Sequence, residues 1–132
     1  MLRRLVLALS LVALSACNEA TNPSDLKNQS FTLAPGQSRT TAGAAIRILF
    51  DGVSGDSRCP ADVVCIQGGD AIVRILARSP GATERSYDLH TGNLQPVTHD
   101  GATITLVQLV PYPFSSGTIA PSEYRVTLLV SE

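Results

Sequence analysis

The chain of 132 residues has no tryptophan and only three tyrosines and three phenylalanines, so its hydrophobic core must consist mainly of valine, isoleucine, leucine and alanine. Lys27 is the only lysine, which excludes a polybasic membrane patch, and the lack of a basic stripe argues against nucleic acid as a partner. After the first 16 residues no segment keeps apolar residues at helical spacing for three turns, and none is long and apolar enough to cross a bilayer. These absences favour a protein built from strands.

The first 16 residues have the features of a secretory signal peptide. Arg3 and Arg4 give a short positive start, and residues 5–14 form an almost unbroken apolar run. Such a run suits a signal peptide and is too short for a membrane-spanning helix, which needs about 20 apolar residues. The small residues Ser15 and Ala16 precede the expected cleavage point, as a signal peptidase requires.

The end of this segment, Leu14-Ser15-Ala16-Cys17, resembles the lipobox of bacterial lipoproteins. The resemblance implies that the Cys17 thiol receives a diacylglyceryl group, that cleavage leaves Cys17 as the new N-terminus, and that its amine accepts a further fatty acid such as palmitate. Two or three acyl chains anchor a protein stably, whereas one chain gives only marginal binding. An ordinary secretory signal with a chance cysteine is the alternative.

Residues 17–29 are polar and without apolar periodicity, which is typical of a flexible tether. By resemblance to lipoproteins of bacteria with two membranes, an aspartate after the lipidated cysteine would favour the inner membrane, so Asn18 favours the outer one. We therefore expect an exported lipoprotein of the cell envelope that faces the periplasm or the cell surface. Its first partner is the membrane, through Cys17.

Cleavage before Cys17 leaves 116 residues, enough for one domain with a hydrophobic core but not for two. It also removes Arg3 and Arg4, so eight basic side chains remain against eleven acidic ones, a net charge of −3. We expect one all-β domain over residues 30–132.

Once Cys17 is set aside, Cys59 and Cys65 remain, and an even pair in an exported domain predicts a disulfide. Closing so short a loop stabilises a fold by roughly 2–2.5 kcal/mol in the chain-entropy treatment. A CxxC redox motif has two intervening residues, whereas here there are five, so oxidoreductase chemistry is disfavoured. Zinc bound together with His90 and His99 is the alternative, although the spacing does not match a zinc knuckle.

Apolar residues recur at every second position in several segments, which is typical of half-buried strands. The predicted strands are Phe31–Leu33, Ile46–Phe50, Asp70–Arg78, Tyr87–Leu89, Thr103–Val110 and Tyr124–Val130. Turn residues cluster at 52–56, 79–81, 91–93, 99–101 and 115–117. In Thr103–Val110 the apolar face changes side, which predicts a bulge or burial on both faces. About seven short strands favour a single antiparallel β-sandwich of immunoglobulin-like type, with a small β-barrel as the alternative.

Residues 56–71 form the most distinctive segment. It begins with Asp56-Ser57-Arg58-Cys59-Pro60, has a second cysteine at Cys65 and continues through Gly69 to Ala71. At these positions the chain resembles a group of uncharacterised bacterial lipoproteins and secreted domains, whose flanking strands follow a similar order. Gln67 departs from the pattern, which has a tryptophan there. The resemblance implies the fold and the cellular setting and carries no activity.

The same segment predicts a constrained loop between two strands. Pro60 fixes one backbone angle, and the bridge between Cys59 and Cys65 limits the rest. Gly68 and Gly69 allow positive φ values or a close approach to another part of the chain.

Arg58 lies next to the bridge in sequence, and its guanidinium fork suits a carboxylate. Asp56, Asp62 and Asp70 are all within reach along the chain. One interpretation is a structural loop locked by an Arg–Asp pair. The other is a rigid recognition loop, because a constrained loop loses less entropy on binding.

Two proline-flanked aromatics, Tyr112 and Phe114, offer either a rigid apolar contact surface or packing over one end of the sandwich. Together with Arg58 and the three aspartates, they are the candidate binding residues.

No set of residues predicts catalysis. Gly55-Asp56-Ser57 superficially resembles the start of a GDSL-type hydrolase block, but the further Gly, Asn and Asp-x-x-His elements of that family are absent. His99 and Asp100, with Ser115 or Ser116, supply the members of a triad, yet a triad is defined by geometry rather than by inventory.

Asp51, Asp56 and Asp62 carry the ligand type for calcium, but their spacing matches no EF-hand loop. We expect no catalytic residue, no metal and no cofactor. The sequence favours a non-enzymatic, lipid-anchored envelope domain that binds a protein or glycan or plays a structural part. The alternative is an inhibitor or accessory subunit of an envelope enzyme, acting through the disulfide-closed loop 56–70, and an unusual hydrolase is the third possibility.

Overall fold

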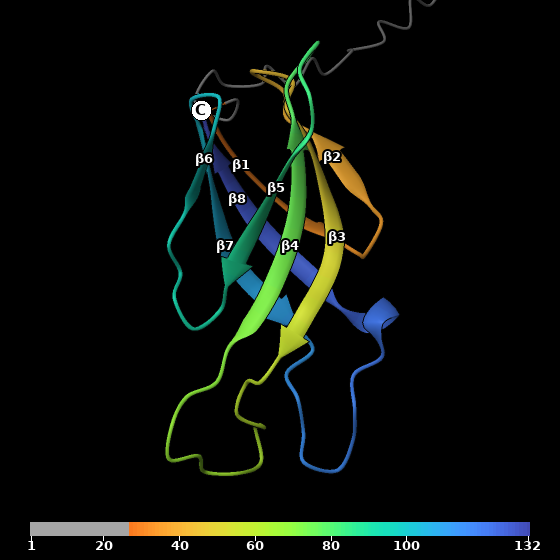
Figure 1. Ribbon diagram of the computed structural model, residues 1–132, viewed down its shortest axis with the longest axis vertical. Helices are drawn as coiled ribbons and strands as arrows, with labels where there is room; N and C mark the ends of the chain where they lie inside the picture. The colour runs from red at the N-terminus through yellow and green to blue at the C-terminus, as the bar shows by residue number, and fades with distance from the viewer. Residues whose placement is uncertain (1–26) are drawn as a thin grey trace, which may run out of the picture.

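The computed structural model describes residues 27–132, which form two four-stranded antiparallel sheets packed face to face (Figure 1). In chain order the elements are β1 (Asn28–Leu33), β2 (Ser38–Thr40), β3 (Arg47–Asp56), β4 (Ala71–Arg78), β5 (Arg85–His90), β6 (Val97–His99), β7 (Ala102–Val110), the 3₁₀ helix η1 (Pro121–Glu123) and β8 (Arg125–Ser131). β1 begins at Asn28, before the expected domain boundary at residue 30. The predicted signal peptide, the predicted lipidation site at Cys17 and most of the predicted tether lie outside the described residues.

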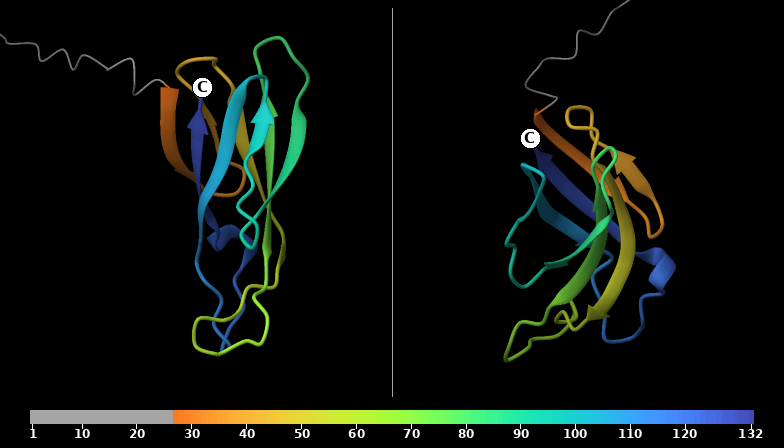
Figure 2. Two further views of the ribbon diagram at one scale, coloured as in Figure 1. Left: turned by 90° about the vertical axis from the view of Figure 1, so that its left-hand side faces the viewer. Right: turned by 45° about the horizontal axis from the view of Figure 1, so that its top comes forward.

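The predicted all-β sandwich is confirmed, but its strand order is not that of an immunoglobulin domain. One sheet has the order β1-β8-β7-β6 and the other β2-β3-β4-β5. Paired strands are therefore consecutive in the chain except β1 and β8, whereas immunoglobulin domains use Greek-key connections. The chain passes between the sheets after β1 and again after β5, and the sheets do not close into the alternative small barrel (Figure 2).

The core lies between the sheets and is mainly aliphatic, as the lack of tryptophan requires. Alternate residues of the long strands are buried, including Ile48, Phe50, Val73, Ile75, Ile104, Val126, Leu128 and Val130. Burial of each Val, Leu, Ile or Phe side chain contributes about 1.5–3 kcal/mol. The period-2 pattern therefore identified the inward faces of β3, β4 and β8 correctly.

β7 contains the predicted irregularity. Its register against β8 shifts between Leu106 and Gln108. Leu106 and Leu109 are both buried, while Val107 is 53% exposed. The bulge explains why the apolar face changes side within this strand.

β3 is longer than the sequence predicted. Residues 52–56, expected as a turn, continue the strand to Asp56. The register against β4 shifts between Phe50 and Gly52 and again between Val53 and Gly55. These bulges absorb extra residues, so a glycine-containing segment that suits a turn lies in a strand instead.

Two short strands, β2 and β6, were not predicted. Each has three residues, too few to show a period. β6 ends at His99, which was expected to lie in a turn. The turn itself is formed by Asp100 and Gly101, whose φ angles are 47° and 88°.

The two ends of the sandwich carry different parts of the chain. The chain enters β1 beside the C-terminus at one end, which we call the entry end (Figure 1). The loops 57–70 and 111–120 lie together at the opposite end, which we call the loop end (Figure 1). Within residues 27–132, no helix has the length and apolar character needed to span a lipid bilayer.

Gly69→Ala is expected to destabilise the domain, because a Cβ atom at Gly69 would lie 1.5 Å from the carbonyl oxygen of Ser57. The two backbone segments would have to separate, and overpacking of this kind costs about 1–3 kcal/mol. Urea denaturation measures the loss. Gly68→Ala is the matched control, because nothing lies within 4 Å of its Cβ position, and equal losses in the two variants would contradict the close approach.

Candidate functional site

The side chain of Arg58 lies at the centre of the loop end. It is only 6% exposed and forms an ion pair with Asp56, the last residue of β3. Nε donates to Oδ1 at 2.9 Å and Nη2 donates to Oδ2 at 2.7 Å, so the guanidinium holds both carboxylate oxygens. Of the three aspartates within reach by sequence, the structure therefore places Asp56 against Arg58.

The remaining donors of Arg58 reach the other sheet. Nη1 donates to the carbonyl oxygen of Leu109 at 2.8 Å, and Nη2 donates to that of Pro111 at 2.8 Å. Leu109 belongs to β7 and Asp56 to β3, which lie in different sheets. The guanidinium therefore joins the two sheets at the loop end.

Two tyrosines complete this cluster. The Tyr124 hydroxyl donates to Oδ2 of Asp56 at 2.9 Å, and the ring centroid of Tyr112 lies 5.0 Å from Cζ of Arg58, a cation–π contact. Tyr112 was among the candidates predicted from the sequence, whereas Tyr124 was not. The alternation over residues 124–130 predicted that Tyr124 is buried but gave no sign of what its hydroxyl contacts.

Charge and burial act against each other on Asp56. Burial alone would raise the pKa of its carboxyl group, but hydrogen bonds from Arg58 and Tyr124 outweigh burial and hold the pKa below its usual value. The hydrogen bond to Asp56 raises the pKa of Arg58. Burial, followed by the hydrogen bond to Asp56, raises the pKa of Tyr124. At neutral pH the cluster is therefore a carboxylate–guanidinium pair with a neutral phenol.

The two loops of the loop end are bonded to each other beyond this cluster. The backbone N–H of Ala61 donates to the carbonyl oxygen of Pro113 at 2.9 Å. The backbone N–H of Ser115 donates to Asp62 at 2.9 Å, and its hydroxyl donates to the same carboxylate. These bonds from Ser115 lower the pKa of Asp62. Asp62 therefore fixes one loop to the other and is not the partner of Arg58.

The predicted disulfide between Cys59 and Cys65 is confirmed, with 6.0 Å between the Cα atoms. It consumes both thiols, so neither is a zinc ligand. His90, one of the two histidines weighed as zinc ligands, lies against Asp70 instead.

Apolar side chains project from the loops that these bonds hold. Val64 and Ile66 are fully exposed, and Val63 is 42% exposed. Tyr112 and Phe114, from the neighbouring loop, are each 56% exposed. We call these five residues the apolar tip.

Asp70 occupies a separate polar cluster at the start of β4. Its carboxylate accepts hydrogen bonds from the backbone N–H of Gly92 at 2.8 Å and from the Thr91 hydroxyl at 3.2 Å, and it lies 2.5 Å from Nδ1 of His90. Burial would raise the pKa of Asp70, but the hydrogen bonds from Gly92 and His90 lower it. This aspartate holds the end of β5 against the start of β4.

His99 forms a polar cluster that sequence analysis did not foresee. Its side chain is fully buried, with the Tyr87 hydroxyl 3.0 Å from Nδ1 and the Ser79 hydroxyl 3.1 Å from Nε2. Ser79 donates its proton to Asp100 at 2.5 Å, so His99 does not accept that proton and donates from Nε2 to Ser79 instead. Tyr87 lies in β5 of the other sheet, and Ser79 directly follows β4 of that sheet, which is why no local pattern indicated them.

The hydrolase and calcium arrangements weighed from the sequence are not assembled. The β6–β7 turn lies at the entry end, whereas residues 111–120 lie at the loop end, so His99 and Ser115 are far apart (Figure 1). The Ser57 hydroxyl donates to the carbonyl oxygen of Asp70 at 3.0 Å. Asp56 and Asp62 are held by Arg58 and Ser115 rather than around a common ion.

The structure thus brings Arg58, Asp56 and Tyr112 together and gives Asp62 and Asp70 other partners. Comparison with protein-family models, with curated proteins and with solved structures finds no match to this chain. The candidate site is therefore the loop end, a buried ionic cluster beneath an apolar tip.

Arg58→Met is expected to destabilise the domain by about 3–5 kcal/mol, because it leaves the largely buried carboxylate of Asp56 without its cation. Urea denaturation at neutral pH measures the free energy of unfolding. Arg74→Met is the matched control, because the pair between Arg74 and Asp88 is exposed and such pairs contribute about 0–1 kcal/mol. Similar losses in the two variants would show that the Arg58 cluster contributes no more than a surface pair.

The contribution of Asp56 to stability is expected to disappear in acid. Its folded-state pKa is lower than the ordinary value of 3.8, so the unfolded chain binds the proton more tightly. The stabilisation is complete above the unfolded pKa and is lost as the pH falls through the folded pKa. Asp56→Asn should therefore reduce the slope of unfolding free energy against pH below about pH 4. An unchanged slope in this variant would contradict the lowered pKa.

Proposed function

We propose that this protein is an exported, lipid-anchored domain of the bacterial cell envelope that binds a partner protein through the apolar tip and has no catalytic activity of its own. The observation that carries the proposal is the full exposure of Val64 and Ile66 on a loop closed by a disulfide. Single exposed apolar residues are ordinary, whereas a group of them on two bonded loops is typical of an interaction site.

The support beneath the tip favours binding. Arg58 joins the two sheets, Asp62 joins the two loops, and the Cys59–Cys65 bridge closes the outer part of one loop. A segment held in this way loses little conformational entropy when a partner covers it. The structural and recognition interpretations of the loop are therefore compatible, because the contacts that hold the loop in place also lower the entropy that it loses on binding.

The chemistry of the tip favours a protein over a glycan. Val63, Val64 and Ile66 are aliphatic, and such side chains gain free energy by entering an apolar pocket, about 1.5–3 kcal/mol for complete burial of one of them. Glycan recognition depends on hydrogen bonds to hydroxyl groups, for which these side chains have neither donors nor acceptors.

The N-terminal sequence supports the anchor. A charged start, an apolar run and the lipobox-like Leu14–Cys17 occur in the required order, and Asn18 favours the outer membrane. The resemblance of residues 56–71 to bacterial lipoproteins supports the same setting. Because the chain enters the domain at the entry end, an anchor at Cys17 would leave the apolar tip at the far end from the point of attachment (Figure 2).

The contacts of the candidate catalytic groups support a non-enzymatic role. His99 is buried with both ring nitrogens bonded, and the Ser79 proton is directed to Asp100 rather than to His99. The hydroxyls of Ser57 and Ser115 likewise donate hydrogen bonds to oxygen atoms within the fold. Each of these groups has a structural partner in place of a substrate.

Chemical cross-linking in native membranes is expected to capture a partner protein with the wild-type chain. The double substitution Val64→Ser and Ile66→Ser should lower the yield about tenfold or more, because it removes two apolar side chains from the contact. Both positions are fully exposed, so the domain should unfold at an unchanged urea concentration.

Ala44→Ser is the control for this experiment, because Ala44 is also exposed but lies between β2 and β3, beside the C-terminal residue Glu132 at the entry end. It should keep the full yield. Equal yields from the wild type, the control and the double variant would refute binding through the apolar tip. Arg58 is unsuitable for this test, because its substitution disturbs the fold.

A second candidate function is inhibition or support of an envelope enzyme, favoured by the way the loop between β3 and β4 projects beyond the strands (Figure 2). A projecting, disulfide-closed loop with an aliphatic tip has the form needed to enter an enzyme cleft. Adding the wild-type chain in equimolar amount should then change the turnover of the captured partner, and the Val64→Ser chain should not. A partner without enzymatic activity would leave the simple binding function.

Intact-mass analysis of the membrane fraction tests the anchor. We expect a chain that starts at Cys17 with diacylglyceryl and acyl additions and that has no alkylatable thiol before reduction. Cys17→Ser should abolish the acyl additions and keep the disulfide, because Cys59 and Cys65 pair with each other. An unacylated wild-type chain recovered from the cytosol with its leader attached would refute both the anchor and the location.

A further inference from the structure

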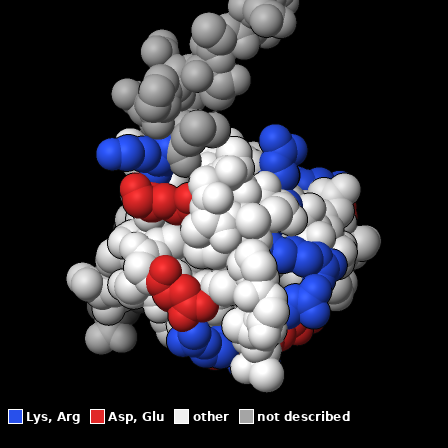
Figure 3. Space-filling model, turned by 90° about the horizontal axis from the view of Figure 1, so that it is seen from above, with Lys and Arg blue, Asp and Glu red and all other residues white. Residues whose placement is uncertain are grey.

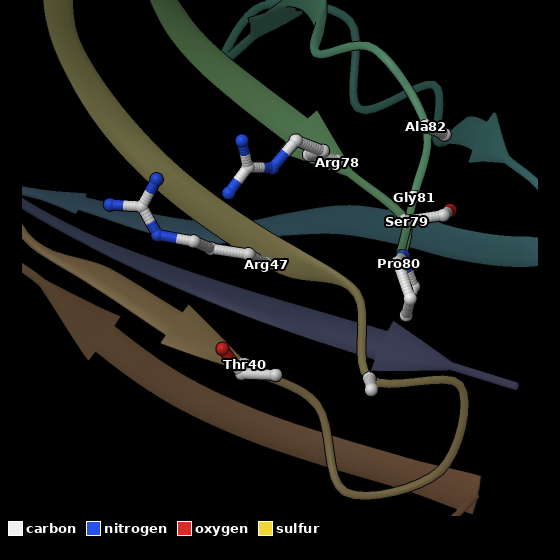
Figure 4. Close-up of a pocket in the computed structure, with 8 residues that line it drawn as sticks. Thr40, Arg47, Arg78, Ser79, Pro80, Gly81 and Ala82 are labelled. Carbon is white, nitrogen blue, oxygen red and sulfur yellow. The ribbon is translucent and has the colours of Figure 1, made fainter.

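A hollow of about 450 Å³ lies on the outer face of the second sheet, where β3 begins and β4 ends (Figure 4). Arg47 and Arg78 line it together with Thr40 and the turn at residues 79–82. It is at the entry end and is separate from the apolar tip. Figure 3 looks onto this end and shows basic side chains gathered on one side of it.

Arg47 and Arg78 face each other directly across the β3–β4 pair, where they are register partners. Their neighbours Ile46, Ile48 and Ala77 are buried, so the two arginines lie on the outer face. Like charges directly opposite each other on paired strands destabilise a sheet. The fold therefore keeps an unfavourable juxtaposition at this point.

Within residues 27–132, no carboxylate lies within 4.0 Å of either guanidinium. Arg74, on the same face of β4, shows the ordinary arrangement, because Asp88 accepts hydrogen bonds from Nε and Nη2 of its guanidinium. Nε of Arg47 donates to the Ser38 hydroxyl at 3.2 Å, which orients the guanidinium and leaves both terminal nitrogens available. Figure 4 shows the two arginine side chains extending in the same direction from neighbouring strands, away from the turn at residues 79–82.

We propose that Arg47 and Arg78 form a binding site for a phosphate group. A phosphate monoester carries a charge of about −1.5 to −2 at pH 7, which matches two positive charges that have no carboxylate partner among residues 27–132. Its oxygens suit the planar fork of arginine, and two forks approaching from neighbouring strands give the bidentate contacts that phosphate favours. The Thr40 hydroxyl, which also lines the hollow, adds one further donor.

The place of this site in the fold leaves two sources for the phosphate group. The hollow lies at the entry end, where β1 begins, and the proposed anchor at Cys17 precedes β1 in the chain, so a phospholipid headgroup is one source. A soluble phosphate or phosphate ester is the other. Both present the same oxygens to the two arginines, and soluble probes of each kind distinguish them.

Thermal unfolding of the full chain in inorganic phosphate tests the site, with sodium chloride at equal ionic strength as the reference. A ligand that binds only the folded state raises the unfolding temperature in a saturable way. We expect this rise for the wild type, and at least a tenfold weaker apparent affinity for Arg47→Gln and for Arg78→Gln. Arg74→Gln is the matched control, because it makes the same change in charge on the same face of β4 and should keep the wild-type response.

Unfolding in phosphate-free buffer of low ionic strength provides a second readout. Removing one arginine of the facing pair relieves its repulsion, so Arg47→Gln and Arg78→Gln should unfold at the wild-type temperature or above it. A clear fall in both variants would show that the arginines stabilise the fold without a ligand, and it would overturn the proposal. Equal responses to phosphate and chloride, or equal phosphate responses in all variants, would overturn it as well.

Two soluble esters then identify the source. Glycerol phosphate presents a monoester, and glycerophosphoglycerol presents the diester of a phospholipid headgroup without its acyl chains. A response to the monoester alone supports a soluble phosphate ligand. A response to both that depends on Arg47 and Arg78 supports a lipid headgroup at the entry end.

Discussion

The pairing of Arg58 with Asp56 is the interaction on which the loop end depends. Removing a guanidinium from water is costly, and here the cost is offset by both oxygens of a carboxylate, two backbone carbonyls and the face of an aromatic ring. Because the carboxylate belongs to one sheet and Leu109 to the other, the same contacts that satisfy the charge also fix the distance between the sheets. The loops that carry the apolar tip begin at this fixed point.

Much of the fold follows from alternation in the sequence, and what does not follow depends on partners across the sheets. The long strands around Phe50, Ile75 and Leu128 were predicted because each buries one face and shows a period of two. β2 and β6 were missed because three residues show no period. Residues 52–56 continue β3 because bulges against β4 accommodate their glycines, and that register exists only in the folded sheet.

The candidate site was predictable to the same degree. The pair of cysteines that remains once Cys17 is set aside was enough to predict the Cys59–Cys65 disulfide, and the guanidinium of Arg58 was expected to hold a carboxylate. The choice of Asp56 among three aspartates depends on where the loop turns back, and the hydroxyl of Tyr124 comes from 68 residues away. The facing arginines on β3 and β4 are likewise invisible until the register places Arg47 opposite Arg78.

The pairing of β1 with β8 has a mechanical consequence. Six residue pairs, from Asn28–Ser131 to Leu33–Val126, join the first strand to the last along the length of the sandwich. A force applied between the start of β1 at the entry end and the loops at the loop end would draw β1 lengthwise past β8. The hydrogen bonds of this ladder would then carry the force together instead of breaking one after another. Phe31 and Leu33 would also have to slide out of contact with the core. The first strand of the domain is thus joined to the fold in the geometry that best resists tension.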